Sequence, residues 1–419
     1  MELLGPAGAA LAAELEEADA VPSRRDLFLV PDGVAYLAGN SLGLQPRAAR
    51  GAVEDVLEAW AVSAVDAHLE GTYPWLSYHE TMRDTVAGLV GARPGEAVVM
   101  NSLTVNLHLM MRSFYCPTRE RYRIVIEADV FPSDRYAVMG VARAHGLDPD
   151  EAVVVLAPRP GERHLRTDDV TDFFDREGAS VAVVVLSAID FRTGALLDIP
   201  TITAAAHRAG ARIGWDLAHA AGNVPVLLHD WQVDFAVWCH YKYVNSGPGA
   251  VGGCFVHDHH GSDPELVRPG GWWGHDPGSR FAMPFAFAPV AGVEGWQVSN
   301  PPILAMAPVR VSLALFAGVG MEALRARSMR LTGFLERLLD AVAARRPVAV
   351  ITPRDPDRRG AQLSVMVDDA ATVTEALFRQ HRVRADDRPP NIVRLAPAPL
   401  YNTYHDCWRA AGALDAVLA

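Results

Sequence analysis

The chain has 419 residues, with 50 acidic against 38 basic side chains and a formal net charge of −12 at pH 7. This acidic balance argues against nucleic acid or an anionic membrane as a partner. No apolar run is long enough to span a bilayer, and the N-terminus lacks the basic region of a signal peptide, so we expect a cytoplasmic protein. The four cysteines are scattered without CxxC or disulfide spacing, and the sequence predicts no metal site.

Short apolar segments alternate with amphipathic stretches through the middle of the chain. We expect strands at residues 123–127, 152–156, 181–186, 211–215, 235–239 and 253–256, and helices at 133–144, 167–176 and 199–209. Strands that are apolar almost throughout and are joined by helices are typical of a mostly parallel sheet covered on both faces. The pattern therefore predicts a doubly wound α/β domain.

The character of the sequence changes after Asn300-Pro301-Pro302. Two long helical patterns follow at about 303–318 and 321–345, then short strands near 348–351 and 362–367 and helices near 372–380 and 406–418. A chain of this length favours one large and one smaller domain. We expect an N-terminal segment, residues 1–45, that packs on the small domain, a large domain, residues 46–305, and a small C-terminal α+β domain, residues 306–419.

One lysine, Lys242, stands in this chain, and the other 37 basic residues are arginines. Arginine supplies positive charge and salt bridges as well as lysine does. It cannot, however, lose a proton near neutral pH and attack a carbonyl as a free amine. The single lysine therefore indicates a Schiff-base lysine, the alternative being a chance survivor on the surface.

Asp216 ends a predicted buried strand and precedes Lys242 by 26 positions. In open α/β sheets, ligands bind outside the carboxyl ends of the strands, and 26 residues allow a loop, a further strand and a return to the same edge. A carboxylate beside a Schiff-base lysine suits pyridoxal 5'-phosphate (PLP), because it holds the pyridine nitrogen protonated. The alternative for Asp216 is a helix N-cap.

Two further segments offer contacts to such a cofactor. Ser102-Leu103-Thr104 opens a helical stretch, where backbone N–H groups and hydroxyls together bind phosphate, although hydroxyl-rich helix starts are also ordinary caps. Phe131-Pro132-Ser133-Asp134 follows a predicted strand and precedes a helix. It offers an aromatic face and a second carboxylate, or is an ordinary capped turn.

Many ordered motifs resemble those of kynureninases, which are PLP enzymes of the fold type I (aspartate aminotransferase) class. The resemblance spans nearly the whole chain and rests on residues 38–46, 103–108, 131–134, 216–224, 228–231, 241–243, 271–275, 299–304, 394–397 and 400–402. So many matches in order are specific, although any one alone is not. The resemblance implies the fold type I architecture, a large domain with a mostly parallel seven-stranded sheet and a smaller C-terminal α+β domain.

The resemblance also implies roles for particular residues. Lys242 forms the Schiff base, Asp216 meets the pyridine nitrogen, and Tyr241 contacts the phosphate and donates a proton near the scissile bond. These three are the predicted catalytic residues. The predicted cofactor-binding set adds Leu103, Thr104, Phe131 (which stacks on the ring), Asp134, Ser187, His219, Trp272 and Asn300.

The implied reaction is hydrolytic cleavage of the Cβ–Cγ bond of L-kynurenine or 3-hydroxy-L-kynurenine to the corresponding anthranilate and L-alanine. Arg394 is predicted to bind the substrate α-carboxylate, since a planar guanidinium suits that task. Trp272 and Asn300 are expected to reach the site from the second subunit of a homodimer.

Substrate choice rests on two features. His68 lies in a segment resembling the one that carries a ring-contacting histidine in animal-type kynureninases. With Asn300 and Trp272 it completes the predicted substrate-binding set and favours a ring hydroxyl. The alternative for His68 is a solvated histidine at a helix end. Asp190 and Arg192 stand where the family usually has a histidine and an aromatic residue, so a further ring-substituted substrate stays open.

Other activities of the same fold class share Asp216 and Lys242, namely cysteine desulfurases and aminotransferases. A desulfurase needs a reactive cysteine on a mobile loop, whereas Cys239 and Cys254 lie in or beside predicted strands. An aminotransferase needs a keto-acid partner. A catalytically silent PLP-binding regulator is disfavoured, because neither a DNA-binding segment nor a basic surface is found in the sequence.

Overall fold

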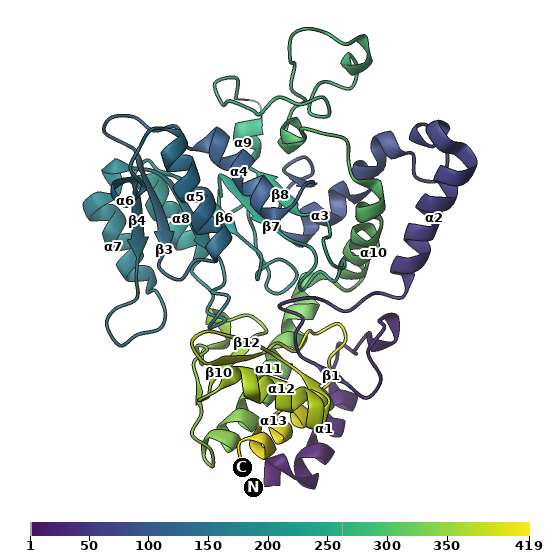
Figure 1. Ribbon diagram of the computed structural model, residues 1–419, viewed down its shortest axis with the longest axis vertical. Coiled ribbons are helices and arrows are strands. Elements are labelled where there is room, and N and C mark those ends of the chain that lie inside the picture. Colours follow the sequence, from purple (N-terminus) through teal and green to yellow (C-terminus); the bar gives the residue numbers. More distant parts are fainter. Residues whose placement is uncertain (1, 262) are drawn as a thin grey trace.

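A seven-stranded sheet is the centre of the larger part of the computed structural model, which describes residues 2–261 and 263–419 (Figure 1). The strand order is β2-β8-β7-β6-β5-β3-β4, and β8 runs antiparallel to both of its neighbours. The strands are β2 Ala97–Val99, β3 Arg123–Glu127, β4 Val153–Leu156, β5 Val181–Ser187, β6 Arg212–Asp216, β7 Phe235–Trp238 and β8 Gly253–Val256. The predicted mostly parallel sheet of seven strands is confirmed.

Helices cover both faces of this sheet because its strands are apolar on both sides. On one face α4 (Leu103–Phe114) and α5 (Pro132–Ala144) share a buried core with β3, β5 and β7. On the other face α7 (Thr167–Glu177), α8 (Ile199–Arg208) and α10 (Ile303–Val319) join a larger core. The seven residues of β5 are all buried, which explains their continuous Val-rich composition.

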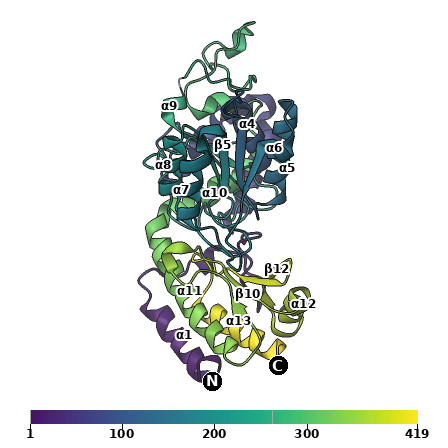
Figure 2. The ribbon, with the colours of Figure 1, turned by 90° about the vertical axis from the view of Figure 1, so that its left-hand side faces the viewer.

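A smaller body lies below the sheet in Figures 1 and 2 and is built mostly from the C-terminal part of the chain. Its four-stranded antiparallel sheet has the order β12-β13-β10-β9. Its elements are α11 Met321–Ala343, β9 Ala349–Val350, β10 Leu363–Met366, α12 Ala370–His381, β11 Val383–Arg384, β12 Asp386–Arg388, β13 Ile392–Leu395 and α13 Tyr404–Val417. The strands β11 to β13 escaped prediction because they are short and carry charged residues.

The N-terminal segment packs on this smaller body. The helix α1 (Pro6–Ala18) lies beside α13, and β1 (Ala35–Tyr36) pairs in parallel with β11. Ala12, Ala35 and Leu37 are buried in the core of the smaller body. These contacts support the predicted packing of residues 1–45.

The helices α2 (Ala48–Ser63) and α3 (Arg83–Leu89) follow, and α10 packs against both. Met306, Val309 and Leu313 of α10 belong to the core of the larger body, so that core extends beyond the predicted boundary at residue 305. The division into domains stays a prediction.

No single helix in the described ranges is long and apolar enough to cross a membrane. The α10–α11 pair meets the length and composition criterion only jointly, and its two helices are bent by 82° relative to each other.

Candidate active site

A cavity of about 240 Å³ opens at the carboxyl ends of the central strands. Nine of the predicted cofactor-binding residues line it, and these are Leu103, Thr104, Phe131, Asp134, Ser187, Asp216, His219, Tyr241 and Lys242. The sequence did not single out four other residues of the wall, Ser133, Ile189, Phe191 and Ala218. The strand register explains why these residues lie together. The parallel strands β5 and β6 are aligned so that Ser187 lies opposite Asp216 at the same edge of the sheet.

The lysine loop leaves β7 and turns sharply against the N-terminal segment. The backbone N–H of Gly43 donates to the carbonyl oxygen of Tyr241 at 2.8 Å. A Cβ on Gly43 would lie 2.4 Å from the carbonyl oxygen of Lys242, so only glycine fits here. The Lys242 Nζ lies 5.9 Å from the ring centre of Phe131 and 5.8 Å from that of Tyr241. The amine is therefore held between two aromatic rings in the cavity.

Two carboxyl groups that interact with each other, those of Asp134 and Asp216, line this cavity. Asp216 ends β6, and its Oδ1 accepts a hydrogen bond from the backbone N–H of Ala218 at 2.6 Å. Burial raises the pKa of Asp216, while Asp134 and Lys242 oppose this shift. Burial, followed by the charge of Asp216, raises the pKa of Asp134 to about 9. Asp134 therefore keeps its proton at neutral pH.

A third buried carboxyl group, Glu127 at the end of β3, was missed in the sequence. Its Oε1 accepts a hydrogen bond from the backbone N–H of Ser187 at 3.1 Å. Burial raises the pKa of Glu127 to about 7, against the opposing effect of the Ser187 hydrogen bonds. The available signal was an acidic residue at the end of an apolar strand, the same signal that pointed to Asp216.

His219 and Tyr241 are kept in their neutral forms. Burial, then the positive charges of Lys242 and Arg394, lower the pKa of His219 well below its usual value. Burial raises the pKa of Tyr241 above 10, so its phenol keeps its proton at neutral pH. Two buried polar atoms, Nδ1 of His219 and Oδ2 of Asp134, have no hydrogen-bond partner in the described residues. They are available to a bound group.

The start of α4 has the geometry of an anion site. Ser102 precedes the helix in an extended conformation, and its side chain does not cap the helix. The backbone of Gly252 approaches closely, since a Cβ there would lie 3.1 Å from the Leu103 nitrogen and 2.8 Å from the Trp238 carbonyl oxygen. The first turn of α4 thus presents its N–H groups and the Thr104 hydroxyl to the cavity, which suits a phosphate group.

Arg394 lies outside the cavity wall, fully buried on β13. Its Nε donates to Asp386 Oδ1 at 2.8 Å, and its Nη1 donates to the carbonyl oxygen of Phe191 at 2.6 Å. Phe191 itself lines the cavity, so the guanidinium lies directly behind the wall. The sequence did not reveal Asp386 as its partner, because the two residues lie in separate short strands whose pairing depends on tertiary structure.

The other predicted residues do not line the cavity of this single chain. His68 ends the 3₁₀ helix η3 (Ala64–His68), with its ring 5.1 Å from that of Trp75. Trp272 is partly exposed, 5.5 Å from the ring of Phe281, and Asn300 is exposed. Trp272 and Asn300 are the two residues expected to act across a dimer interface.

The two residues that depart from the family pattern shape the turn beside the cavity. The Asp190 carboxylate accepts hydrogen bonds from the backbone N–H groups of Arg192 at 2.7 Å and Thr193 at 3.3 Å. The Arg192 side chain pairs with Asp129. Between them, Phe191 meets Phe131 edge-on at 5.4 Å. These contacts hold the turn that places Phe191 in the cavity wall.

Comparison with solved structures identifies the class of fold. A C-DES mutant with glycine linked covalently to its PLP cofactor superposes with a TM-score of 0.77, at 17% identity, over 92% of this chain and 98% of that one. The cysteine desulfurase CsdA from Escherichia coli gives 0.75 at 18% identity, over 94% and 97%. At such identities the likeness concerns the fold alone. The chain has the fold of fold type I PLP-dependent enzymes.

Comparison with curated proteins identifies the family. Kynureninase of Salinispora tropica is 60% identical over 413 residues, 96% of each chain. Kynureninases of Myxococcus xanthus and Koribacter versatilis are 50% and 48% identical, over 96% and 95% of each chain. The profile of the kynureninase C-terminal domain matches residues 324–414. The chain belongs to the kynureninase family, and the resemblance found in the sequence is confirmed.

Proposed function

We propose that this protein hydrolyses the Cβ–Cγ bond of L-kynurenine or a ring-substituted relative and releases an anthranilate and L-alanine. The observation that carries the proposal is the full-length 60% identity to a kynureninase. The cavity in which Lys242 and Asp216 meet supports it. The desulfurase alternative is disfavoured, because burial raises the pKa of the Cys239 and Cys254 thiols and the exposed Cys116 does not line the cavity.

PLP fits this cavity by the chemistry of the walls. Lys242 supplies an amine, Asp216 a buried carboxylate, Phe131 an aromatic face, and the start of α4 a phosphate cradle with Thr104. The unpartnered Nδ1 of His219 adds a polar contact. When bound, PLP supplies an electron sink that stabilises a carbanion at the substrate Cα.

Four side chains of this protein then carry the reaction. Lys242 would hold PLP through its amine, and as a free amine it would take the proton from the substrate Cα. Asp216, as a carboxylate at the end of β6, would favour a protonated pyridine nitrogen. Tyr241, which keeps its phenolic proton, donates it at the Cβ–Cγ bond after water has added to the γ-carbonyl. Arg394 binds the α-carboxylate.

We expect Arg394→Lys to raise the KM for kynurenine by about 10- to 100-fold, with a smaller change in kcat. The reason is that lysine cannot make the two parallel hydrogen bonds of a guanidinium to a carboxylate. Arg388→Lys is the matched control, since Arg388 also lies near Asp386, at 3.4 Å, yet is partly exposed. Steady-state kinetics on both variants measure this, and an unchanged KM in Arg394→Lys would remove Arg394 from substrate binding.

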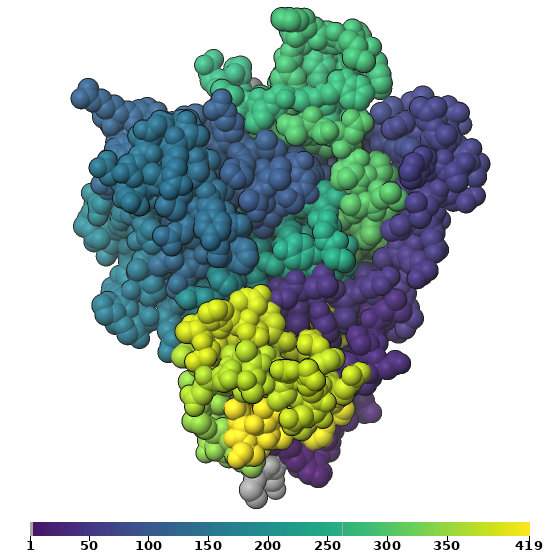
Figure 3. Space-filling model, in the orientation of Figure 1, coloured from purple at the N-terminus to yellow at the C-terminus, as the bar shows by residue number. Residues whose placement is uncertain are grey.

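We further propose a homodimer with shared active sites. Trp272, Phe281, Met283, Phe285 and Phe287 are exposed on a segment that projects from the larger body, seen at the top of Figures 1 and 3. Exposed clusters of aromatic side chains mark interaction surfaces. Contact of this segment with a second copy would bury these side chains and carry Trp272 toward the other cavity.

Substrate cleavage tests the proposed function. The purified protein, offered L-kynurenine and 3-hydroxy-L-kynurenine separately, should release alanine and a fluorescent anthranilate from each. We expect kcat/KM to be at least about 10-fold higher for 3-hydroxy-L-kynurenine than for L-kynurenine. L-kynurenine lacks the ring hydroxyl and would leave polar groups such as His68 and Asn300 without a hydrogen-bond partner. His68→Ala should reduce that preference. Failure to cleave both compounds and ring-substituted versions would refute the proposal.

A further inference from the structure

A second cluster of titratable side chains lies at the edge of the large sheet opposite to Lys242. Glu96 directly precedes β2, His257 and Asp258 follow β8, and His229 lies in the loop that leads to β7. Because β8 is antiparallel to β2 and β7, its end meets their beginnings. The active-site residues follow the carboxyl ends of β6 and β7, so this cluster belongs to a different site.

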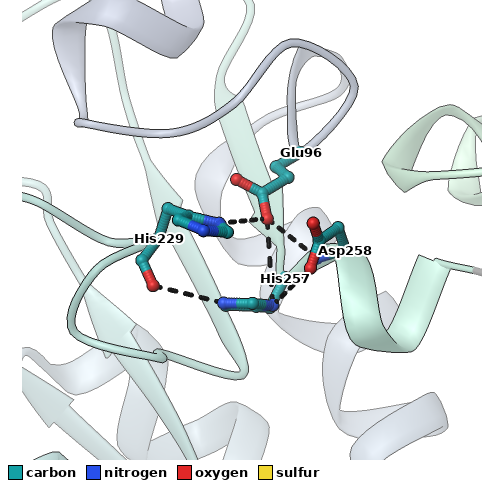
Figure 4. Close-up of side chains that lie close together, drawn as sticks. All are labelled: Glu96, His229, His257 and Asp258. Atoms are coloured by element: carbon teal, nitrogen blue, oxygen red, sulfur yellow. Dashed lines mark hydrogen bonds and ion pairs between the residues drawn. The ribbon is translucent and has the colours of Figure 1, made fainter.

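The four side chains converge on a common point (Figure 4). Each offers one ligand atom, and these atoms all lie within 4.8 Å of one another. The His229 Nδ1 is 2.8 Å from Glu96 Oε1, and the His257 Nδ1 is 3.0 Å from Asp258 Oδ1 and 3.8 Å from Glu96 Oε1. Ligands of a tetrahedral zinc ion, at about 2.0–2.2 Å from the metal, are about 3.4 Å apart. The observed distances bracket that value.

The orientation of His257 leaves a lone pair facing the carboxylates. Its Nε2 lies 3.2 Å from the carbonyl oxygen of His229, which can only accept, so this nitrogen carries the proton. In the neutral ring the Nδ1 lone pair then faces the carboxylate oxygens of Glu96 at 3.8 Å and Asp258 at 3.0 Å, and it accepts one long hydrogen bond, from the backbone N–H of His259 at 3.4 Å. A cation between this nitrogen and the two carboxylates, either a proton or a metal ion, would stabilise the arrangement. A carbonyl that fixes the far nitrogen is the usual support of a metal-binding histidine.

The cluster is also held in place without the ion. The Glu96 side chain is 1% exposed and that of His257 is 4% exposed. Glu96 Oε1 accepts the backbone N–H of Asp258 at 2.9 Å, and Oε2 accepts that of Arg93 at 2.7 Å. The rings of His229 and His257 are stacked at 4.7 Å. Such preorganisation lowers the cost of ordering the ligands when a metal ion binds.

A neighbouring cluster shows what a carboxylate saturated by the protein looks like. The Asp234 carboxylate forms four hydrogen bonds. Its partners are Nε2 of His207 at 2.8 Å, Nε2 of His260 at 2.7 Å, the guanidinium of Arg212 at 3.2 Å and the backbone N–H of Ile213 at 2.8 Å. Its charge is balanced by these groups. In the first cluster the one arginine, Arg93, contacts the outer oxygen of Asp258 and leaves Oδ1 for another cation.

We propose that Glu96, His229, His257 and Asp258 bind one divalent transition-metal ion, zinc by preference. Two nitrogen and two oxygen donors suit zinc, and four protein ligands are typical of a structural site. The ion would tie the loop before β7 and the end of β8 to the start of β2. The sequence predicted no metal site because Glu96 and Asp258 are 162 positions apart, although His257-Asp258-His259-His260 was a visible signal.

Metal titration of the untagged, PLP-loaded protein tests this site. We expect one Zn²⁺ per chain in competition with a chelator, a higher unfolding temperature with zinc, and the visible absorption of tetrahedral Co²⁺ when cobalt replaces it. His257→Ala should weaken binding by at least about 100-fold. His259→Ala is the matched control: its ring packs on that of His257, with centres 4.2 Å apart, but its Nε2 faces His260 at 2.8 Å, so this variant should bind the metal as the unaltered protein does.

A second variant covers the case in which His257→Ala does not fold. Glu96→Gln keeps the side-chain shape and an acceptor for a backbone N–H. It should weaken zinc binding by the same factor as His257→Ala, at least about 100-fold. The proposal is overturned if the unaltered protein binds no stoichiometric zinc, or if Glu96→Gln and His257→Ala both bind zinc as His259→Ala does. These readouts do not depend on kynurenine cleavage, so failure here and failure of the proposed function are separate results.

Discussion

Lys242→Arg is expected to lower kcat/KM for kynurenine by at least about 10⁴-fold while the fold is retained. Arginine keeps the positive charge between Phe131 and Tyr241, but its guanidinium neither forms a stable Schiff base nor removes a proton from Cα near neutral pH. The variant should bind PLP without the absorption of a Schiff base. Product release and the cofactor spectrum measure the two effects.

The composition of the chain makes the labelling experiment unusually clear. Borohydride should fix the cofactor to one side chain only, because Lys242 is the single lysine. The mass of the intact protein gives the stoichiometry, and peptide mapping separates Lys242 from the N-terminal amine. Arg388→Lys, which adds a second lysine outside the cavity, should gain no second label. Retained turnover in Lys242→Arg would refute the role of Lys242.

Asp216→Asn is expected to lower kcat by about 10³-fold, the scale on which preorganised electrostatic groups contribute. Asparagine preserves the shape and can still accept the Ala218 N–H through Oδ1, but it removes the charge that keeps the pyridine nitrogen protonated. The spectrum of the bound cofactor and its dependence on pH report the protonation, and kinetics report the loss of rate.

Asp134→Asn is the matched control for this pair. The pKa of Asp134 is raised to about 9 by burial and by Asp216, so an amide resembles its protonated form at neutral pH and the loss of rate should stay within about 10-fold. An equal loss of kcat in Asp216→Asn and Asp134→Asn would show that the negative charge is not confined to Asp216.

The same shift in pKa predicts how the cofactor-free protein responds to pH. The folded Asp134 keeps its proton up to about pH 9, whereas the unfolded carboxyl group releases it near its usual value of 3.8. Above pH 3.8 the folded state therefore binds more protons than the unfolded state, and this residue makes stability fall as the pH rises toward 9. We therefore expect the unfolding temperature of Asp134→Asn to fall less between pH 5 and pH 8 than that of the unaltered protein. Thermal unfolding measured across this pH range gives the difference.

Much of the architecture was determined by the sequence alone. The strands β3 to β8 were predicted to within two residues at each end, because continuous apolar runs bounded by helical periodicity are local signals. Asp216 and Lys242 were found because one ends a buried strand and the other is unique in composition. The rule that strand ends share one edge of the sheet then placed them in one cavity.

The tertiary structure alone decided the partners of these residues. Burial raises the pKa values of Asp134 and Glu127, and no local pattern reports how deeply a strand end is covered. Arg394 pairs with Asp386 across two short strands, β12 and β13, which are too short for a pattern of residues to reveal their pairing. The helix α10 belongs to the larger core although most of it lies beyond the expected boundary at residue 305.

The cluster of Glu96, His229, His257 and Asp258 is the clearest case of what the sequence by itself left undetermined. Its members come from three separate parts of the chain, and only the order β2-β8-β7 brings them together. Strand order depends on long-range packing and connection geometry, whereas residue patterns report on neighbours in sequence. The sequence thus determined the elements, the family and the reactive amine. The packing of the sheet decided which charges meet.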